Sequence, residues 1–158
     1  MNKEKQDLVN LLKRIDQTKK ELKKLMSEYE KVFTAICKSW QEQTASAFPD
    51  LQPCGIGEYV GVDVVYEGKT YNVFISEYNQ KLYCMFSLDR KDKSTYSLSL
   101  KDEETALFEK LNNLFTDDSD KKSSVRYTGV GLFKVFKKDN YEEAFDFYLK
   151  VVESFTVH

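Results

Sequence analysis

The feature that most constrains this fold is a stretch without proline or glycine that runs from Asn2 to Ala47. Because these two residues interrupt helices, their absence predicts one continuous helix. Within the stretch, apolar residues recur at a strict spacing of seven. Position a of this heptad is occupied by Leu8, Ile15, Leu22, Tyr29 and Ile36, and position d by Leu11, Thr18, Leu25, Val32 and Ser39.

A heptad sustained over more than four repeats is typical of a left-handed seam between two helices. A helix of this length would span roughly 65 Å, which is too long to be hidden on a body of about 110 residues. We therefore expect self-association. The expected oligomer interface consists of Leu8, Leu11, Ile15, Leu22 and Leu25.

The apolar stripe widens toward the end of this segment, because Met26, Phe33 and Trp40 occupy the neighbouring e positions. A stripe of a, d and e residues suits packing on a globular body or in a multi-helix bundle. We expect residues 3–25 to project and pair, and the later residues to dock on the body. The alternative is a monomer in which the whole helix folds back on its own domain. The expected docking residues are Tyr29, Phe33, Ile36 and Trp40.

Two prolines, Pro49 and Pro53, follow the helical segment and mark the clearest boundary in the chain. They force extended backbone before them and end the helix. The expected organisation is a coiled-coil-like helix over 1–47, a linker over 48–57 and a body over 58–158.

The body begins with strands, because apolar residues alternate over 60–66, 71–75, 82–88 and 96–100. Short turns at Glu67-Gly68 and Asn79-Gln80 require antiparallel neighbours. A helix is expected from Asp102, a strand or hairpin over 125–137, and a final helix with Asp139 and Glu142 as a capping box. The predicted fold class is α+β, with an antiparallel sheet of four to six strands and two helices on one face.

Residue usage argues against several kinds of enzyme. The only histidine is His158, at the end of the chain, and Cys37, Cys54 and Cys84 form no C-x-x-C pair. Nucleophilic catalysis by Ser or Cys usually needs a fixed imidazole, and zinc sites need clustered Cys and His. We therefore expect no catalytic site, no metal and no cofactor. With no signal peptide or membrane span in the sequence, the expected location is the cytoplasm.

One alternative is a minimal metal-dependent nuclease, or a degenerate nuclease-like protein that binds nucleic acid. Asp63 lies in the first expected strand, and Asp89 and Lys91 form a D-x-K after the third. This spacing is similar to the pattern of PD-(D/E)XK nucleases. The resemblance implies that the two carboxylates hold Mg²⁺ and that the lysine steadies the attacking water.

Charge and aromatic residues bear on the partner. The first 48 residues carry ten Lys or Arg against seven Asp or Glu, and the remainder carries fourteen against nineteen. Nucleic acid is therefore not the expected partner, because its binding needs clustered positive charge. Tyrosine is enriched where proteins dock, so Tyr71, Tyr83 and Tyr96 are candidates for a partner-binding sheet face.

The element order of a helix, an antiparallel sheet and further helices, with an acidic body, resembles the architecture of type III secretion chaperones. The expected function is that of a self-associating module that binds another protein. An adaptor, an escort chaperone and a small inhibitor, such as an anti-defence protein of a mobile element, all fit this pattern.

Overall fold

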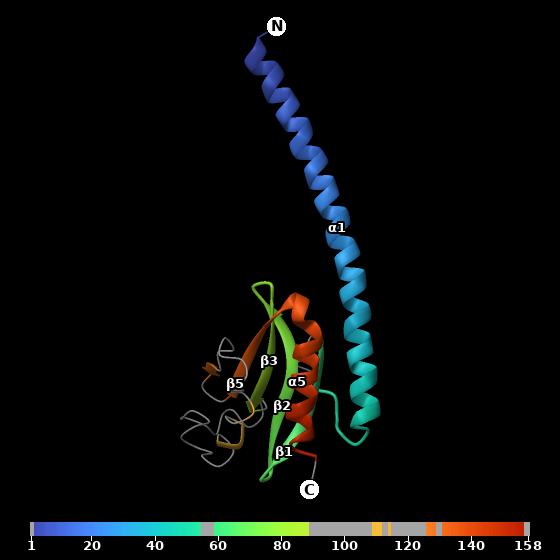
Figure 1. Cartoon of the computed structure of the whole chain (residues 1–158), viewed down its shortest axis with the longest axis vertical. Helices are drawn as coiled ribbons and strands as arrows, with labels where there is room; N and C mark the ends of the chain where they lie inside the picture. The colour runs from blue at the N-terminus through green and yellow to red at the C-terminus, as the bar shows by residue number, and fades with distance from the viewer. Residues whose placement is uncertain are drawn as a thin grey trace. The chain divides into compact units, whose positions relative to one another are not determined.

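The computed structural model describes residues 2–54, 59–88, 109–111, 114, 126–128 and 131–156. It opens with one helix, α1 (Lys3–Ala47), as the proline- and glycine-free stretch predicts (Figure 1). The Asn2 side chain accepts a hydrogen bond of 2.7 Å from the Glu4 amide, which caps the first turn. The helix ends two residues before Pro49, whose ring restricts the residue before it.

The chain forms two compact units, Met1–Ser39 and Trp40–His158. The division falls inside α1, so that about two turns of this helix, from Trp40 to Ala47, belong to the second unit. The remainder of the second unit is built on an antiparallel sheet.

The sheet has five strands in the order β1-β2-β3-β5-β4, and each neighbouring pair is antiparallel. Two tight turns, at Glu67-Gly68 and Asn79-Gln80, join β1 to β2 and β2 to β3, and all four turn residues have positive φ, between 48° and 80°. This conformation matches the twist of a hairpin. The strands are β1 (Val60–Tyr66), β2 (Lys69–Tyr78), β3 (Lys81–Leu88), β4 (Arg126–Thr128) and β5 (Gly131–Lys137).

The residues that follow α1 extend the sheet at the edge of β1. Cys54 donates its amide proton to the Gly61 carbonyl, and the Asp63 amide donates to the Gln52 carbonyl. Part of the expected linker is therefore fixed to β1. Gly61 lies close to this segment, since a Cβ on it would come within 2.4 Å of the Cys54 sulfur.

Helix α5 (Tyr141–Glu153) packs across β2, β3 and β5 on one face of the sheet (Figure 1). A 3₁₀ turn, η1 (Lys138–Asn140), leads into it. The core lies between α5 and this face, because alternate residues of each strand point toward the helix. It contains Val60, Val62, Val64, Tyr71, Val73, Ile75, Leu82, Cys84 and Phe86 from the sheet and Ala144, Phe145, Tyr148, Val151 and Val152 from α5.

The α+β class and the antiparallel sheet are confirmed. The expected capping box is wrong: η1 occupies Asp139, and Asn140, which precedes α5, makes no side-chain capping bond. The expected strand over 96–100 lies outside the described residues. Of the helix expected from Asp102, residues 109–111 are described and helical.

Candidate binding surface

Exposed apolar side chains gather on one helix. Of the twelve large apolar residues that are exposed in the described chain, ten lie on α1. Nine of these occupy a, d or e positions and are 43–62 % exposed. We call these nine residues the α1 stripe: Leu8, Leu11, Leu12, Ile15, Leu22, Leu25, Met26, Tyr29 and Val32.

The α1 stripe contains all five residues that the sequence assigns to an oligomer interface. The other faces of the helix are mostly polar, with Val9 as the one exposed large apolar residue there. Lys20 forms an ion pair of 3.2 Å with Asp16, and Gln17 donates to Glu21 at 3.4 Å. Such exposed contacts add a few tenths of a kcal/mol each to the helix. The helix is therefore amphipathic, with an apolar side that the described chain leaves in contact with solvent.

The four expected docking residues differ in burial. Tyr29 is 43 % exposed, Ile36 is half-buried, and Phe33 and Trp40 are buried. Trp40 lies in the second unit and stacks on Phe145 of α5, with ring centroids 5.3 Å apart. This contact fixes the last turns of α1 on the face of α5.

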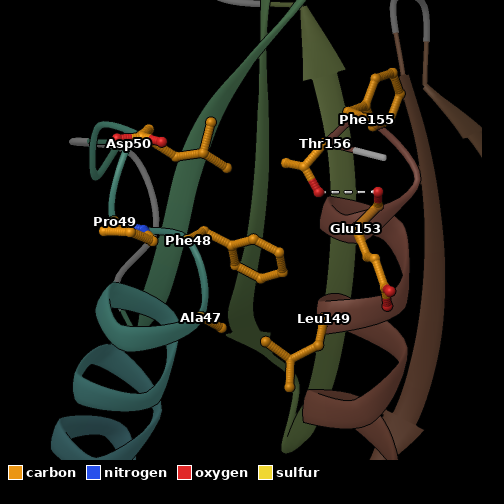
Figure 2. A pocket seen from close by; sticks show the side chains of 9 residues that line it. Ala47, Phe48, Pro49, Asp50, Leu149, Glu153, Phe155 and Thr156 are labelled. Atoms are coloured by element: carbon orange, nitrogen blue, oxygen red, sulfur yellow. Dashed lines mark hydrogen bonds between the residues drawn. The ribbon is translucent and has the colours of Figure 1, made fainter. Parts of the chain in front are cut away.

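A groove of about 800 Å³ lies between the end of α1 and the end of α5. Figure 2 shows Phe48 and Leu149 pointing toward each other across it, with the sheet behind. Asp50 and Glu153 are the charged side chains among the described residues that line it, so the groove is acidic. The remaining lining residues are Ala47, Pro49, Leu51, Phe155 and Thr156.

The three tyrosines proposed for a partner face do not lie together. Tyr71 is fully buried under α5 and stacks on Phe86 at 4.9 Å, so it is a core residue. Tyr83 lies on the opposite face of the sheet, half-buried beside Phe133 at 5.4 Å. Tyr96 lies outside the described residues. Tyr83 pairs with Ser76, whereas Tyr71 shares its face of β2 with Val73 and Ile75, so alternation places the two tyrosines on opposite faces of the sheet.

The structure places one of the three nuclease candidates. Asp63 lies on β1, where its carboxylate accepts a hydrogen bond of 2.7 Å from the Asn72 amide on β2. Asp89 and Lys91 lie outside the described residues. Within the part of the chain that is described, no three His, Cys, Asp or Glu side chains are grouped so that they could hold a metal ion.

An ionic cluster joins β2 to the turn before α5. Glu77 accepts hydrogen bonds from the Tyr59 hydroxyl and the Lys138 ammonium, and Lys138 also donates to Gln80 at 3.3 Å. Burial acts to raise the pKa of Glu77, but the bonds from Lys138 and Tyr59 outweigh it and hold this pKa below its ordinary value. Every charge is matched within the cluster, which suits a structural role.

Two buried side chains with ionisable protons, Cys84 and Tyr148, are held in their neutral forms. Burial raises the pKa of the Cys84 thiol strongly, against a smaller opposite effect of the Lys134 charge. Lys134 is itself 5 % exposed, and its ammonium lies 4.8 Å from the centre of the Phe147 ring. Burial likewise raises the pKa of Tyr148, while the Thr44 hydroxyl lowers it in part. Neither Cys84 nor Tyr148 is ionised at neutral pH, and both serve as core residues.

The chain matches no protein-family model, no curated protein and no solved structure. Among the residues that the structure describes, no helix combines the length and apolar character needed to cross a membrane. The arguments that follow therefore depend on the geometry and chemistry of the chain itself.

Proposed function

We propose that this chain is a non-catalytic protein-binding module that self-associates through the α1 stripe. The observation that carries the proposal is the exposure of nine large apolar side chains along one side of a single helix. A contiguous exposed apolar surface of this kind is rare on a monomer and is characteristic of interaction sites. Its heptad spacing is that of a helix–helix seam, which favours a second α1 as the first partner.

The work of such a module is to hold or to block another protein, as an adaptor, an escort chaperone or a small inhibitor. The buried Cys84 thiol and the internally paired Glu77 support a non-catalytic role, because neither is poised for reaction. Cys37, Cys54 and Cys84 form no disulfide with one another, which fits a cytoplasmic setting.

Replacing Leu22 by glutamate tests this proposal. Leu22 is 56 % exposed in a single chain, so its replacement should cost the fold of that chain little. In a dimer the same change buries a carboxylate in the seam, which is strongly unfavourable. Size-exclusion chromatography with light scattering should show an oligomer for the unaltered chain and a monomer for L22E.

Lys23→Glu is the matched control, because it introduces the same residue at a neighbouring position outside the heptad seam. It should leave the oligomer intact. Equal masses for L22E and the unaltered chain would refute the proposed interface. Magnesium-dependent cleavage of plasmid DNA that is abolished by D89A would refute the non-catalytic part of the proposal.

A further inference from the structure

We infer that two copies of α1 pair in antiparallel orientation, with the two-fold axis at residue 20. This inference rests on the self-association proposed above and adds the orientation and register of the pair. It is argued from the extent of the α1 stripe, from the residues at its d and e positions, and from its flanking charges.

The structure gives the stripe two definite ends. It begins at Leu8 and stops at Val32, because the next apolar residues at its positions are Phe33, which is only 8 % exposed, and Ile36, which is half-buried. The midpoint between Leu8 and Val32 is residue 20. Antiparallel pairing about that point covers the whole stripe of both copies and extends no further.

The layers of this arrangement are well matched. Leu8 lies opposite Val32 of the second copy, and Leu11 lies opposite Tyr29. Toward the axis, Ile15 lies opposite Leu25 and Thr18 opposite Leu22. Thr18 is the one polar residue in the seam, and in each copy it lies opposite a leucine of the other copy.

The d and e positions argue against a parallel pair. Two-stranded parallel coiled coils favour β-branched residues at a and leucine at d. Between residues 8 and 32, only one of the four a positions is β-branched (Ile15), and two of the four d positions are not leucine (Thr18 and Val32). In a parallel pair, Leu12 and Met26 would lie beside Asp7 and Glu21 of the second copy, so apolar side chains would face carboxylates. In the antiparallel pair, Leu12 lies beside Met26.

Charges flanking the seam favour the same orientation. The antiparallel pair places Arg14 beside Glu28 of the second copy, twice per dimer. At the axis, Lys19 lies beside Lys19 of the second copy and Glu21 beside Glu21, once each. The two attractions offset these two repulsions. A parallel pair places Arg14 beside Lys19, which is repulsive and also occurs twice. Opposite charges at these positions set orientation in coiled coils.

The variant Arg14→Glu separates the two orientations by the sign of its effect. In the antiparallel pair it sets two carboxylates side by side, and the dissociation constant should rise about fivefold to tenfold at low salt. In a parallel pair it would turn a repulsion into an attraction, and the constant would fall. No charged residue lies three or four positions from Arg14, so the helix itself should be unaffected.

Lys13→Glu is the matched control, with the same change of net charge at a position facing away from the seam. It should leave the dissociation constant within about twofold, and the effect of R14E should fade in 1 M salt as charges are screened. Tighter association of R14E would overturn the antiparallel orientation. An equal change of the dissociation constant in R14E and K13E would also overturn it, because the change would then depend on net charge alone and not on the position of the residue.

Disulfide formation tests the register. In the inferred pair, residue 15 lies opposite residue 25 of the second copy, and the two copies of residue 15 are about 15 Å apart along the axis. Disulfides need Cα atoms within about 7 Å. A mixture of I15C and L25C should therefore form cross-linked dimers, whereas each variant alone should not exceed the unaltered chain, whose native thiols set the background.

The outcomes distinguish this inference from the proposal beneath it. Cross-linking of I15C alone would show parallel pairing, and more efficient cross-linking in a mixture of L8C and L25C would show a register shifted by one heptad. A dimer by mass without a 15–25 cross-link would also overturn the inference. In each of these cases self-association would stand. A monomer in every sample would overturn the self-association itself.

Discussion

Replacing Trp40 by alanine should destabilise the second unit substantially. Trp40 is 3 % exposed, its ring lies nearly parallel to that of Phe145 at an angle of 4°, and Tyr141 lies 6.4 Å away. Although it belongs to α1, it packs as a core residue of the sheet-bearing unit. Its removal should therefore open a cavity beside Phe145 of α5.

The magnitude follows from the area that this side chain buries. A buried tryptophan removes about 150–250 Å² from water, worth roughly 4–6 kcal/mol at about 25 cal/mol per Å². Alanine keeps a small part of this contribution, and substitutions of buried Phe or Trp by Ala cost about 3–5 kcal/mol. We expect a loss in this range, which corresponds to a Tm lower by roughly 6–20 °C.

Urea unfolding followed by far-ultraviolet circular dichroism measures this loss without depending on tryptophan fluorescence. Val65→Thr is the control, because Val65 is 66 % exposed and threonine keeps the β-branch; its effect should stay within about 0.5 kcal/mol. Trp40→Phe should fall between the two. A loss below about 1 kcal/mol for W40A would refute the conclusion that the last turns of α1 belong to the core.

Three further predictions concern the body. Glu77→Gln should lower the free energy of unfolding by about 1 kcal/mol at pH 7, because it weakens the bond from Lys138. Since the folded-state pKa of Glu77 is lowered, this difference from the unaltered chain should be full above pH 4.5 and disappear as the pH falls further. A pH-independent difference in unfolding free energy would contradict this prediction. In the folded chain, Cys84 should be alkylated far more slowly than Cys54, as mass mapping after brief treatment with iodoacetamide would show; equal rates would contradict its burial. Gly61→Ala should cost about 1–3 kcal/mol in thermal or urea unfolding, because the added Cβ meets a sulfur at 2.4 Å, and an unchanged stability would contradict that close approach.

Elements whose cause is local could be predicted from the sequence. The extent of α1 follows from a stretch without helix breakers, and β1, β2 and β3 follow from alternation between two-residue turns. The turns at Glu67-Gly68 and Asn79-Gln80 adopt the positive φ angles that short hairpins require. Each of these signals lies within a few residues of the element that it predicts.

What depends on distant segments could not be predicted. Alternation shows that Tyr71 and Val73 share one face of β2, but the burial of that face depends on α5, about 70 residues further along the chain. The bond between Glu77 and Lys138 and the groove between Phe48 and Leu149 likewise join segments far apart in sequence. No local pattern marks such contacts, because any charged or apolar residue in the right place would serve.

The candidate surface was predictable in composition but not in extent. The heptad identifies the residues from Leu8 to Leu25 as a seam, while the continuation of the exposed stripe to Val32, and its end before Phe33, are visible only in the structure. The a, d and e pattern continues past Phe33, so the sequence alone does not mark where solvent exposure stops.

The molar mass of the unaltered chain in solution tests the central claim most directly. Sedimentation equilibrium over a concentration series should give a mass that approaches twice the 18.5 kDa of one chain and falls toward 18.5 kDa on dilution. A mass of 18.5 kDa at every concentration would contradict the claim that the α1 stripe is a self-association surface.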